Sequence, residues 1–439
     1  MKLLRKEPGM RYQTAYGLRQ DLIKCKEQMD KKGRLEPFPL GQADELACFR
    51  LPNILYGRDE EKEKILAALE RVSRGRAEAV LVSGYPGVGK TALIYEALKP
   101  AAGKKGFFAA GKFDQLKQNI PYAPFAAAFG NLLKQLMTES QEELRRWRQR
   151  LLDALERNGA LITGIIPELE SIIGKQPPVE ELPPKESENR FHMVFGSFLG
   201  AFAQKDRPLV LFLDDLHWAD QASIHLLKYL IRDAGLRFVL FVGAFRENEV
   251  GEDHPLKELL QKDDEEQPDL LCISLMPLSW KETGALVADT LHAGHRAMTD
   301  LSEILYAKSG GNPLFLKELL VMLHGEGLLF FDEERGSWEW NLDAIQKLKL
   351  GEDILELFVK KLEKLPVESL ELLELASCIG NRFELETLSA VWGKTVEEVS
   401  SCLMPSILEG LVLEAADPKE KEAAKGGAFR FLHDRVQQA

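Results

Sequence analysis

A glycine-rich octapeptide carries the residue types and spacing that could do chemistry in this chain. It fits the pattern G-x-x-x-x-G-K-[ST] at every position, with Gly84, Tyr85, Pro86, Gly87, Val88, Gly89, Lys90 and Thr91. The glycines let the backbone curl so that successive N–H groups point at phosphate oxygens. The lysine adds a mobile positive charge for the β- and γ-phosphates, and the threonine hydroxyl can ligate Mg²⁺. Together with the next residue, Ala92, the octapeptide predicts a binding site for a nucleoside triphosphate with magnesium.

The residues around the octapeptide support this interpretation. A short β-branched run at 79–83 precedes it and reads as a buried strand. An amphipathic pattern over 90–99 follows it and predicts a helix that Pro100 ends. The N-terminal end of such a helix carries a partial positive charge, which favours a bound phosphate.

Two acidic residues, Asp214 and Asp215, follow the apolar run 209–213. In a parallel sheet, a carboxylate at the C-terminal end of a strand lies in the ligand crevice. We expect Asp214 to hold the magnesium ion, directly or through water, and Asp215 to act as general base toward the attacking water. A solvated pair at a strand end is the plainer alternative.

Arg246 follows the fourth predicted strand, which we expect to neighbour the strand that ends at Asp214. An arginine in that place can reach the γ-phosphate and stabilise the charge that builds up during transfer. The alternative is a surface salt bridge with Glu247 or Glu249.

The segment that follows the acidic pair predicts a plain structural role. Asp220 can accept N–H groups of the next helical turn as an N-cap, and Trp218 can pack on the domain.

Five strand-length apolar runs lie between helical stretches, which predicts an α/β domain with a parallel five-stranded sheet covered on both faces. The runs are 79–83, 107–110, 209–213, 238–244 and 270–275. Residues 122–173 read mostly as helices, and the four prolines of 176–185 predict a loop.

Beyond the last run of the sheet the pattern becomes helical. Residues 279–350 predict helices with a small hairpin at 330–340, and residues 353–409 predict more helices, with a capping box that begins at Thr395. Two alternating segments at 411–413 and 429–431 predict a hairpin. Helices followed by a hairpin suggest a winged helix.

The overall composition fits a protein of the cell interior. The 439 residues carry a net charge of −12, which argues against a general nucleic-acid coat. The five cysteines form no CxxC pair, so they predict neither a zinc site nor a disulfide framework. No apolar run nears the roughly 18 residues that a membrane span needs, and the first residues lack a secretory pattern. We expect a cytoplasmic protein without a membrane segment.

Taken together, the phosphate loop, the acidic pair and Arg246 resemble the STAND class of signal-transduction P-loop ATPases. Tyr56, Gly57 and Arg58 resemble that class's hhGRExE motif, which lines the adenine side of the site. Pro313 lies in a segment like the lid motif whose proline packs on the base, and His433 lies where the winged helix of the family carries a histidine that contacts the β-phosphate of ADP. The resemblance implies binding of ATP and ADP, and a homo-oligomer in the ATP state.

Residues 111–115 and 119–122 resemble, more narrowly, the ATPase module of very large bacterial multi-sensor kinases. In those proteins a Ser/Thr kinase domain precedes the ATPase, and a histidine kinase follows it. Residues 1–30 resemble the end of a kinase C-lobe. Because the chain has no glycine-rich kinase loop and no HRD or DFG motif, we expect no protein-kinase activity from it alone.

The predicted organisation has five parts in chain order. These are a kinase C-lobe remnant at 1–30, a linker at 31–53, a P-loop NTPase domain at 54–276, a helical lid at 277–350 and a winged helix at 351–439 that is truncated at its C-terminus.

Three functions remain open on the sequence alone. The first is a slow ATPase switch, closed with ADP and open with ATP, that regulates a larger signalling kinase through other domains of the same polypeptide. The second is a DNA-associated ATPase of the origin-recognition type, which the balanced charges of 417–422 disfavour. The third is a scaffold that holds nucleotide without hydrolysing it.

Overall fold

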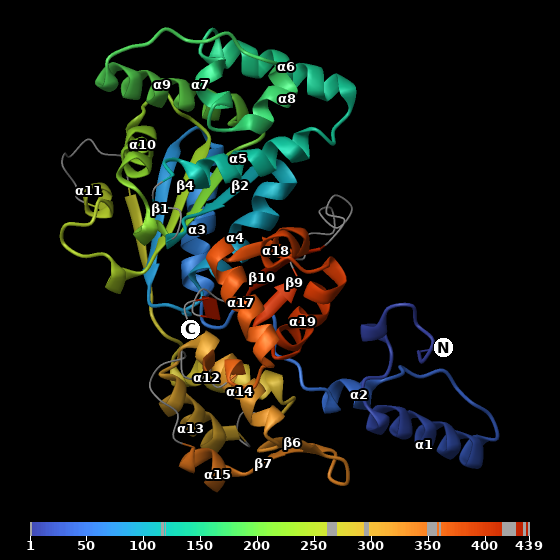
Figure 1. The fold of residues 1–439 in the computed structure, drawn as a ribbon. Helices are drawn as coiled ribbons and strands as arrows, with labels where there is room; N and C mark the ends of the chain where they lie inside the picture. Colours follow the sequence, from blue (N-terminus) through green and yellow to red (C-terminus); the bar gives the residue numbers. More distant parts are fainter. Residues whose placement is uncertain are drawn as a thin grey trace. The chain divides into compact units, whose positions relative to one another are not determined.

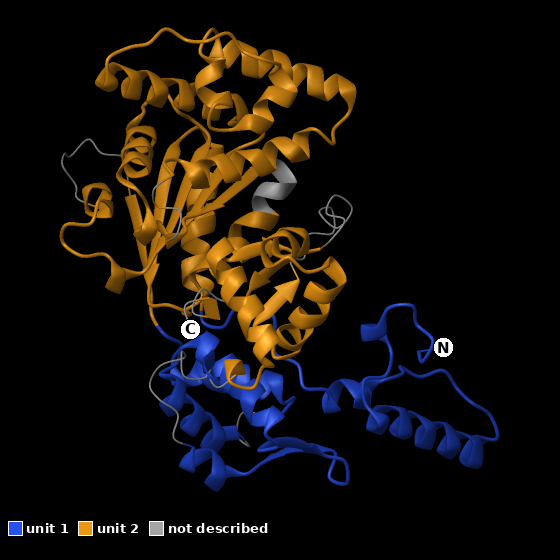
Figure 2. Cartoon of the chain, viewed as in Figure 1, with its two compact units in different colours: residues 1–57, 277–360 blue, residues 58–276, 361–439 orange. Residues whose placement is uncertain are grey.

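The computed structural model describes most of the chain, in two compact units. The described residues are 2–115, 118, 120–260, 270–293, 298–348, 358–359, 361–414, 427–432 and 436–437, with the backbone alone at 101–105. Unit 1 comprises residues 1–57 and 277–360, and unit 2 comprises residues 58–276 and 361–439 (Figure 2).

Unit 2 is built on a five-stranded sheet with the strand order β2-β3-β4-β1-β5 (Figure 1). Every neighbouring pair in this sheet is parallel. The strands are β1 (Ala77–Gly84), β2 (Phe107–Lys112), β3 (Leu209–Asp214), β4 (Val239–Phe245) and β5 (Leu270–Leu275). All five predicted strands are present, and the chain has the predicted α/β fold of a P-loop NTPase.

Helices cover both faces of the sheet because side chains alternate along each strand. Leu211 and Leu213 of β3 join an apolar cluster with residues of α5, α9 and α10. Phe212, between them, points the other way and meets the ring of Tyr95 on α4 at 5.6 Å. The helices on the two faces are α3 (Asp59–Ser73), α4 (Lys90–Lys105), α5 (Ala123–Leu136), α9 (Pro184–Phe202), α10 (Gln221–Arg232) and α11 (Leu256–Leu260).

The prediction that Pro100 ends the helix after the phosphate loop is wrong. Helix α4 runs on to Lys105 with Pro100 inside it. Proline lacks an N–H and its ring crowds the preceding turn, which costs a helix about 3 kcal/mol in its interior. The helix nevertheless continues, so tertiary context outweighs this local preference here.

The residues between β2 and β3 are mainly helical, as predicted. They form α6 (Gln141–Leu155), α7 (Gly159–Thr163) and α8 (Glu170–Ile173) in addition to α5 and α9. Their core is aromatic, with the rings of Trp147 and Phe202 stacked 5.3 Å apart and Phe129 and Phe198 meeting edge to face at 5.0 Å.

In the described residues of the C-terminal part of unit 2, helices pack with a small antiparallel sheet. The elements are α17 (Val367–Ile379), β8 (Arg382–Glu384), α18 (Leu385–Trp392), α19 (Val396–Leu408), β9 (Val412–Glu414) and β10 (Ala428–Phe431), with strand order β8-β10-β9. The predicted pairing of β9 with β10 is confirmed, as is the capping box between Thr395 and Glu398. The strand β8 was not predicted, because three residues are too few to show an alternation of apolar and polar side chains. Of the stretch 353–409 that the sequence predicts to be helical, residues 353–357 and 360 lie outside the described residues.

Unit 1 joins the first segment of the chain to a helical group. Its elements are α1 (Ala15–Lys32), α2 (Gln42–Ala47), α12 (Trp280–Thr290), α13 (Thr299–Ser309), α14 (Pro313–Gly325), β6 (Leu329–Asp332), β7 (Ser337–Trp340) and α15 (Leu342–Lys347). The predicted hairpin at 330–340 is confirmed as β6 and β7. The predicted linker contains α2, whose Leu46 carbonyl accepts a hydrogen bond of 2.9 Å from the Trp338 indole.

Candidate nucleotide site

The phosphate loop connects β1 to α4 and depends on its glycines. Gly84, Gly87 and Gly89 have φ angles of 152°, 78° and 101°, which L side chains rarely adopt. A Cβ atom at Gly84 would also lie 2.7 Å from the carbonyl oxygen of Leu275 on β5. The loop can therefore adopt this course only with glycine at these positions.

Lys90, the first residue of α4, turns its side chain back into the loop. The ammonium Nζ donates to the carbonyls of Gly84 at 2.8 Å and Tyr85 at 3.0 Å. Burial lowers the pKa of Lys90 to about 8, although the carboxylates of Asp215 and Asp214 oppose this fall. A buried cation whose charged form is disfavoured gains stability from an added anion, as a phosphate would provide.

Thr91 and Asp214 meet at the C-terminal edge of the sheet. The Thr91 hydroxyl donates to Oδ2 of Asp214 at 2.8 Å, and Oδ1 of Asp214 accepts the main-chain N–H of Asp215 at 3.0 Å. Two oxygen ligands so close to the phosphate loop fit Mg²⁺, which binds through one or two protein ligands plus phosphate oxygens and water. Within the described residues, no group of three or more His, Cys, Asp or Glu could form an all-protein metal cage.

Asp215 lies in a strained, buried position beside two cations. Its φ of 54° is left-handed, a conformation that costs a non-glycine residue about 1 kcal/mol or more. Its Oδ2 lies 3.1 Å from Nζ of Lys112, and its Oδ1 lies 4.0 Å from Nε of Arg246. Strain and converging charge of this kind cluster at functional sites.

Arg246 follows β4, which pairs with β3 as expected. Its side chain is only 3% exposed, and its Nη1 donates to Oε1 of Glu249 at 2.8 Å. The predicted alternative of an ion pair with Glu249 is therefore present, but the pair is buried on the arginine side rather than on the surface. The same guanidinium also faces Asp215.

His217 completes this group, although no pattern in the sequence predicts a role for it. Its side chain is 1% exposed, its Nδ1 accepts the N–H of Arg246 at 3.3 Å, and its Nε2 lies 3.3 Å from Oε2 of Glu249. The only local signal is a histidine two positions after the acidic pair, on the short turn Leu216–Trp218. The neighbouring expectation is confirmed, because Asp220 caps α10 by accepting the N–H of Ser223 at 2.8 Å.

The remaining predicted residues divide between the two units. Arg58 lies in unit 2, is buried, and donates to the carbonyls of Val88 at 3.3 Å and Met276 at 2.6 Å, so it contacts the phosphate loop. Tyr56 lies in unit 1, where its hydroxyl donates to Asp289 at 2.7 Å.

Gly57 and Pro313 also belong to unit 1. Gly57 has a φ of 61° and Pro313 is the first residue of α14, which Asn312 caps. Their predicted adenine contacts stay predictions. His433 lies outside the described residues.

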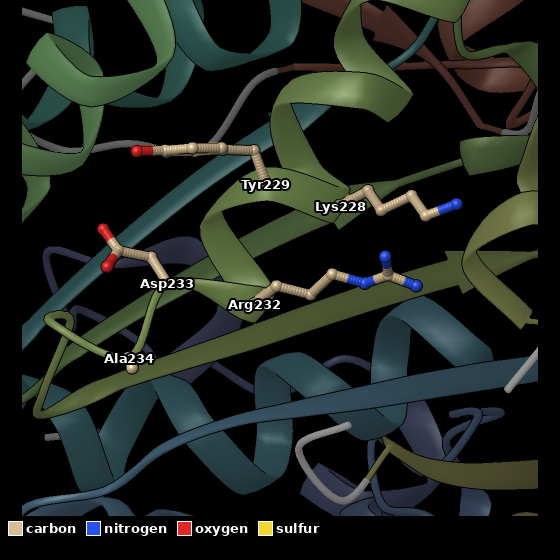
Figure 3. Close-up of a pocket in the computed structure, with 5 residues that line it drawn as sticks. All are labelled: Lys228, Tyr229, Arg232, Asp233 and Ala234. Carbon is tan, nitrogen blue, oxygen red and sulfur yellow. The ribbon is translucent and has the colours of Figure 1, made fainter. Parts of the chain in front are cut away.

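A separate cavity of about 420 Å³ lies along α10. Its lining consists of Lys228, Tyr229, Arg232, Asp233 and Ala234, and Figure 3 shows Lys228 and Arg232 extending to one side, with Tyr229 and Asp233 toward the other. None of the predicted site residues line it.

No helix in the described part of the chain combines the length and the apolar character needed to cross a membrane.

Comparison with known families agrees with this geometry. Residues 54–242 match the family model described as an AAA ATPase domain. The matched range contains the phosphate loop, the acidic pair and the first residues of β4.

Two relatives are histidine kinases. The chain is 31% identical over 500 residues to hybrid signal transduction histidine kinase G of Dictyostelium discoideum, covering 95% of this chain and 14% of that protein. It is 22% identical over 530 residues to a peroxide stress-activated histidine kinase of Schizosaccharomyces pombe, covering 100% of this chain and 22% of that protein. The chain thus spans a small part of each relative. Neither match tests the predicted bacterial origin or the kinase remnant at 1–30.

Among solved structures, the chain is similar to a STAND protein with a tetratricopeptide repeat sensor from Pyrococcus horikoshii. The identity is 17%, the TM-score is 0.44, and the match covers 88% of this chain and 43% of that one. By its matched segment and its sheet, the chain carries an AAA-type ATPase module of the P-loop NTPase fold, similar in sequence to parts of histidine kinases.

Proposed function

We propose that the chain is a slow ATPase switch of the STAND class, closed with ADP and open with ATP. One observation carries this proposal above the others: the 2.8 Å contact of Thr91 with Asp214, beside Lys90 in the same loop. A loop lysine, a helix-start hydroxyl and a strand-end carboxylate are the protein groups that Mg-ATP requires.

Binding follows from the groups of the loop. Lys90 exchanges the carbonyls of Gly84 and Tyr85 for the β- and γ-phosphates, and the start of α4 adds its partial positive charge. Thr91 and Asp214 would hold magnesium, which neutralises phosphate charge when bound. Arg58 keeps its contacts with the carbonyls of Val88 and Met276, and so ties the phosphate loop to the residue that follows β5.

Hydrolysis requires a water in line with the γ-phosphate. Asp215 accepts a proton from this water as its oxygen forms the new bond to phosphorus and the bond to the ADP oxygen breaks. Arg246 stabilises the charge on the transferring group. The ion pair of Asp215 with the exposed Lys112 competes with the action of Asp215 as a base, which favours slow turnover.

The C-terminal segment of unit 2 supports a closed state. A Cβ atom at Gly380, next to the end of α17, would lie 3.3 Å from Oδ2 of Asp114, just after β2. Burial raises the pKa of Tyr95 on α4, and Lys112 and Arg430 of β10 oppose this rise. Gly380 and Arg430 thus lie near Asp114 and Tyr95 of the nucleotide domain, which supports a winged helix that packs on that domain in a closed switch. Contacts of Pro313 with the base and of His433 with the β-phosphate would complete that state.

The switch would act inside a larger signalling protein. The two histidine kinase relatives each contain this segment as a small part. We propose that the chain regulates other domains of such a polypeptide in the cytoplasm, assembles with copies of itself when ATP-bound, and binds no nucleic acid.

The nucleotide content of protein purified without added ligand tests this proposal. A switch of this class should carry bound ADP and turn over slowly after exchange for Mg-ATP. Protein that is free of nucleotide, and that binds DNA with a steep salt dependence, would favour the origin-recognition alternative instead.

A further inference from the structure

Glu249 lies one turn after Arg246 and divides its carboxylate between two partners. Oε1 accepts from Nη1 of Arg246 at 2.8 Å, and Oε2 lies 3.3 Å from Nε2 of His217. The Arg246 and His217 side chains are 3% and 1% exposed, whereas the Glu249 side chain is 28% exposed. The carboxylate therefore closes the solvent side of a buried pair.

The proton on His217 can be placed from its partners. Nδ1 accepts the main-chain N–H of Arg246, so in the neutral ring the proton is on Nε2, which faces Glu249. The carbonyl of His217 is held by Nε2 of His254 at 2.9 Å, and Nδ1 of His254 accepts the N–H of Leu256 at 3.1 Å. His217 is thus fixed at its main chain, and its Nε2 lies within ion-pair distance of Glu249.

Arg246 needs a counter-ion in every nucleotide state. A guanidinium at 3% exposure is costly without a carboxylate or phosphate beside it. Asp215 lies farther from it, at 4.0 Å, and is engaged by Lys112 at 3.1 Å. Glu249 supplies the short contact in the present arrangement.

We propose that Glu249, which lies beside His217, is a positioning residue that holds Arg246 until a γ-phosphate replaces it. This inference rests on the proposed ATPase switch. With ADP, Arg246 pairs with Glu249, and with ATP it exchanges that carboxylate for the γ-phosphate. Glu249 therefore sets the preference of the site between the two nucleotides.

The experiment compares Glu249→Gln with Glu247→Gln in the full chain. Glutamine keeps the shape of Glu249 and removes its charge, so the ADP state loses a charge-assisted bond that the ATP state does not use. Glu247 lies on the same turn with an exposed side chain and serves as the matched control. The ratio of the ADP to the ATP dissociation constant should rise about fivefold in Glu249→Gln and stay at the wild-type value in Glu247→Gln.

The same substitution in Arg246→Ala protein shows whether Glu249 changes the nucleotide preference through Arg246. In Arg246→Ala protein, adding Glu249→Gln should leave the nucleotide preference unchanged, because no guanidinium remains to be held. Three outcomes would overturn the inference. The nucleotide preference could stay unchanged in Glu249→Gln, it could shift toward ADP, or it could shift equally with and without Arg246. A shifted melting temperature without a shifted preference would assign Glu249 a structural role only and would also overturn it.

The two proposals fail differently. If Glu249→Gln behaves like Glu247→Gln while wild-type protein binds Mg-ATP through Lys90, the switch stands and the role of Glu249 falls. If wild-type protein does not bind Mg-ATP at all, both fall.

Discussion

The phosphate loop and the charge cluster at the ends of β2, β3 and β4 differ in how the chain builds them. The loop consists of consecutive residues, and three of its glycines have positive φ angles. The cluster draws Lys112, Asp215, Arg246 and Glu249 from the ends of three strands, through pairs of 2.8 to 4.0 Å. The loop is a local device for binding phosphate, whereas the cluster exists only after the strands are ordered in the sheet.

This difference predicts a division of work in which the cluster controls turnover and the loop controls affinity. The largest expected effect comes from Asp215→Asn, which removes the proton acceptor and keeps the shape. Turnover should fall about 10³-fold, while Mg-ATP affinity changes little. Steady-state phosphate release and nucleotide titration measure the two quantities.

Asp206→Asn, at an exposed carboxylate of the same unit, is the control and should match wild type. If Asp215→Asn changes neither binding nor turnover, Asp215 is no catalytic residue, and if wild-type protein also shows no turnover, the chain is a scaffold that holds its nucleotide.

Gly84→Ala tests the loop. The added Cβ would meet the Leu275 carbonyl at 2.7 Å and would force a φ of 152° on alanine. Mg-ATP affinity should fall about tenfold, because strain of this kind costs about 1–3 kcal/mol. Isothermal titration measures the affinity.

Gly200→Ala is the matched control, since nothing lies within 4 Å of a Cβ there. Equal affinity in both variants would show that the loop does not need its glycine and would remove the basis of the comparison.

The smallest expected effect is the pH dependence of binding. Because the pKa of Lys90 is lowered to about 8, its charged form is present below that pH and is lost above it. Mg-ATP affinity should therefore weaken about threefold from about pH 7.5 to about pH 8.5. Lys90→Arg keeps its charge over this range, so the pH dependence should disappear in that variant. A wild-type affinity that rises with pH would contradict this sign.

The sequence predicted the parts that depend on neighbouring residues. The five strands, the hairpins at 330–340 and at 411–413 with 429–431, and the capping box at Thr395 all follow from local pattern. The contact of Thr91 with Asp214 follows from one further rule, that parallel strands present their C-terminal ends at one edge.

Other features could not be predicted because they depend on packing. His217 enters the site only because β3 and β4 are adjacent and its ring faces the Arg246 N–H. Pro100 remains within α4 despite its local preference to end a helix. Lys112 lies 3.1 Å from Asp215, whose left-handed φ no local sequence pattern predicts.

Mg-ATP binding by Lys90→Ala shows whether the phosphate loop is the nucleotide site, with Lys64→Ala as an exposed lysine control of the same unit. The account predicts that Lys90→Ala loses about 100-fold in affinity while Lys64→Ala binds like wild type, because one buried ammonium that faces the phosphates is removed. Unchanged affinity in Lys90→Ala protein that folds normally would contradict the account.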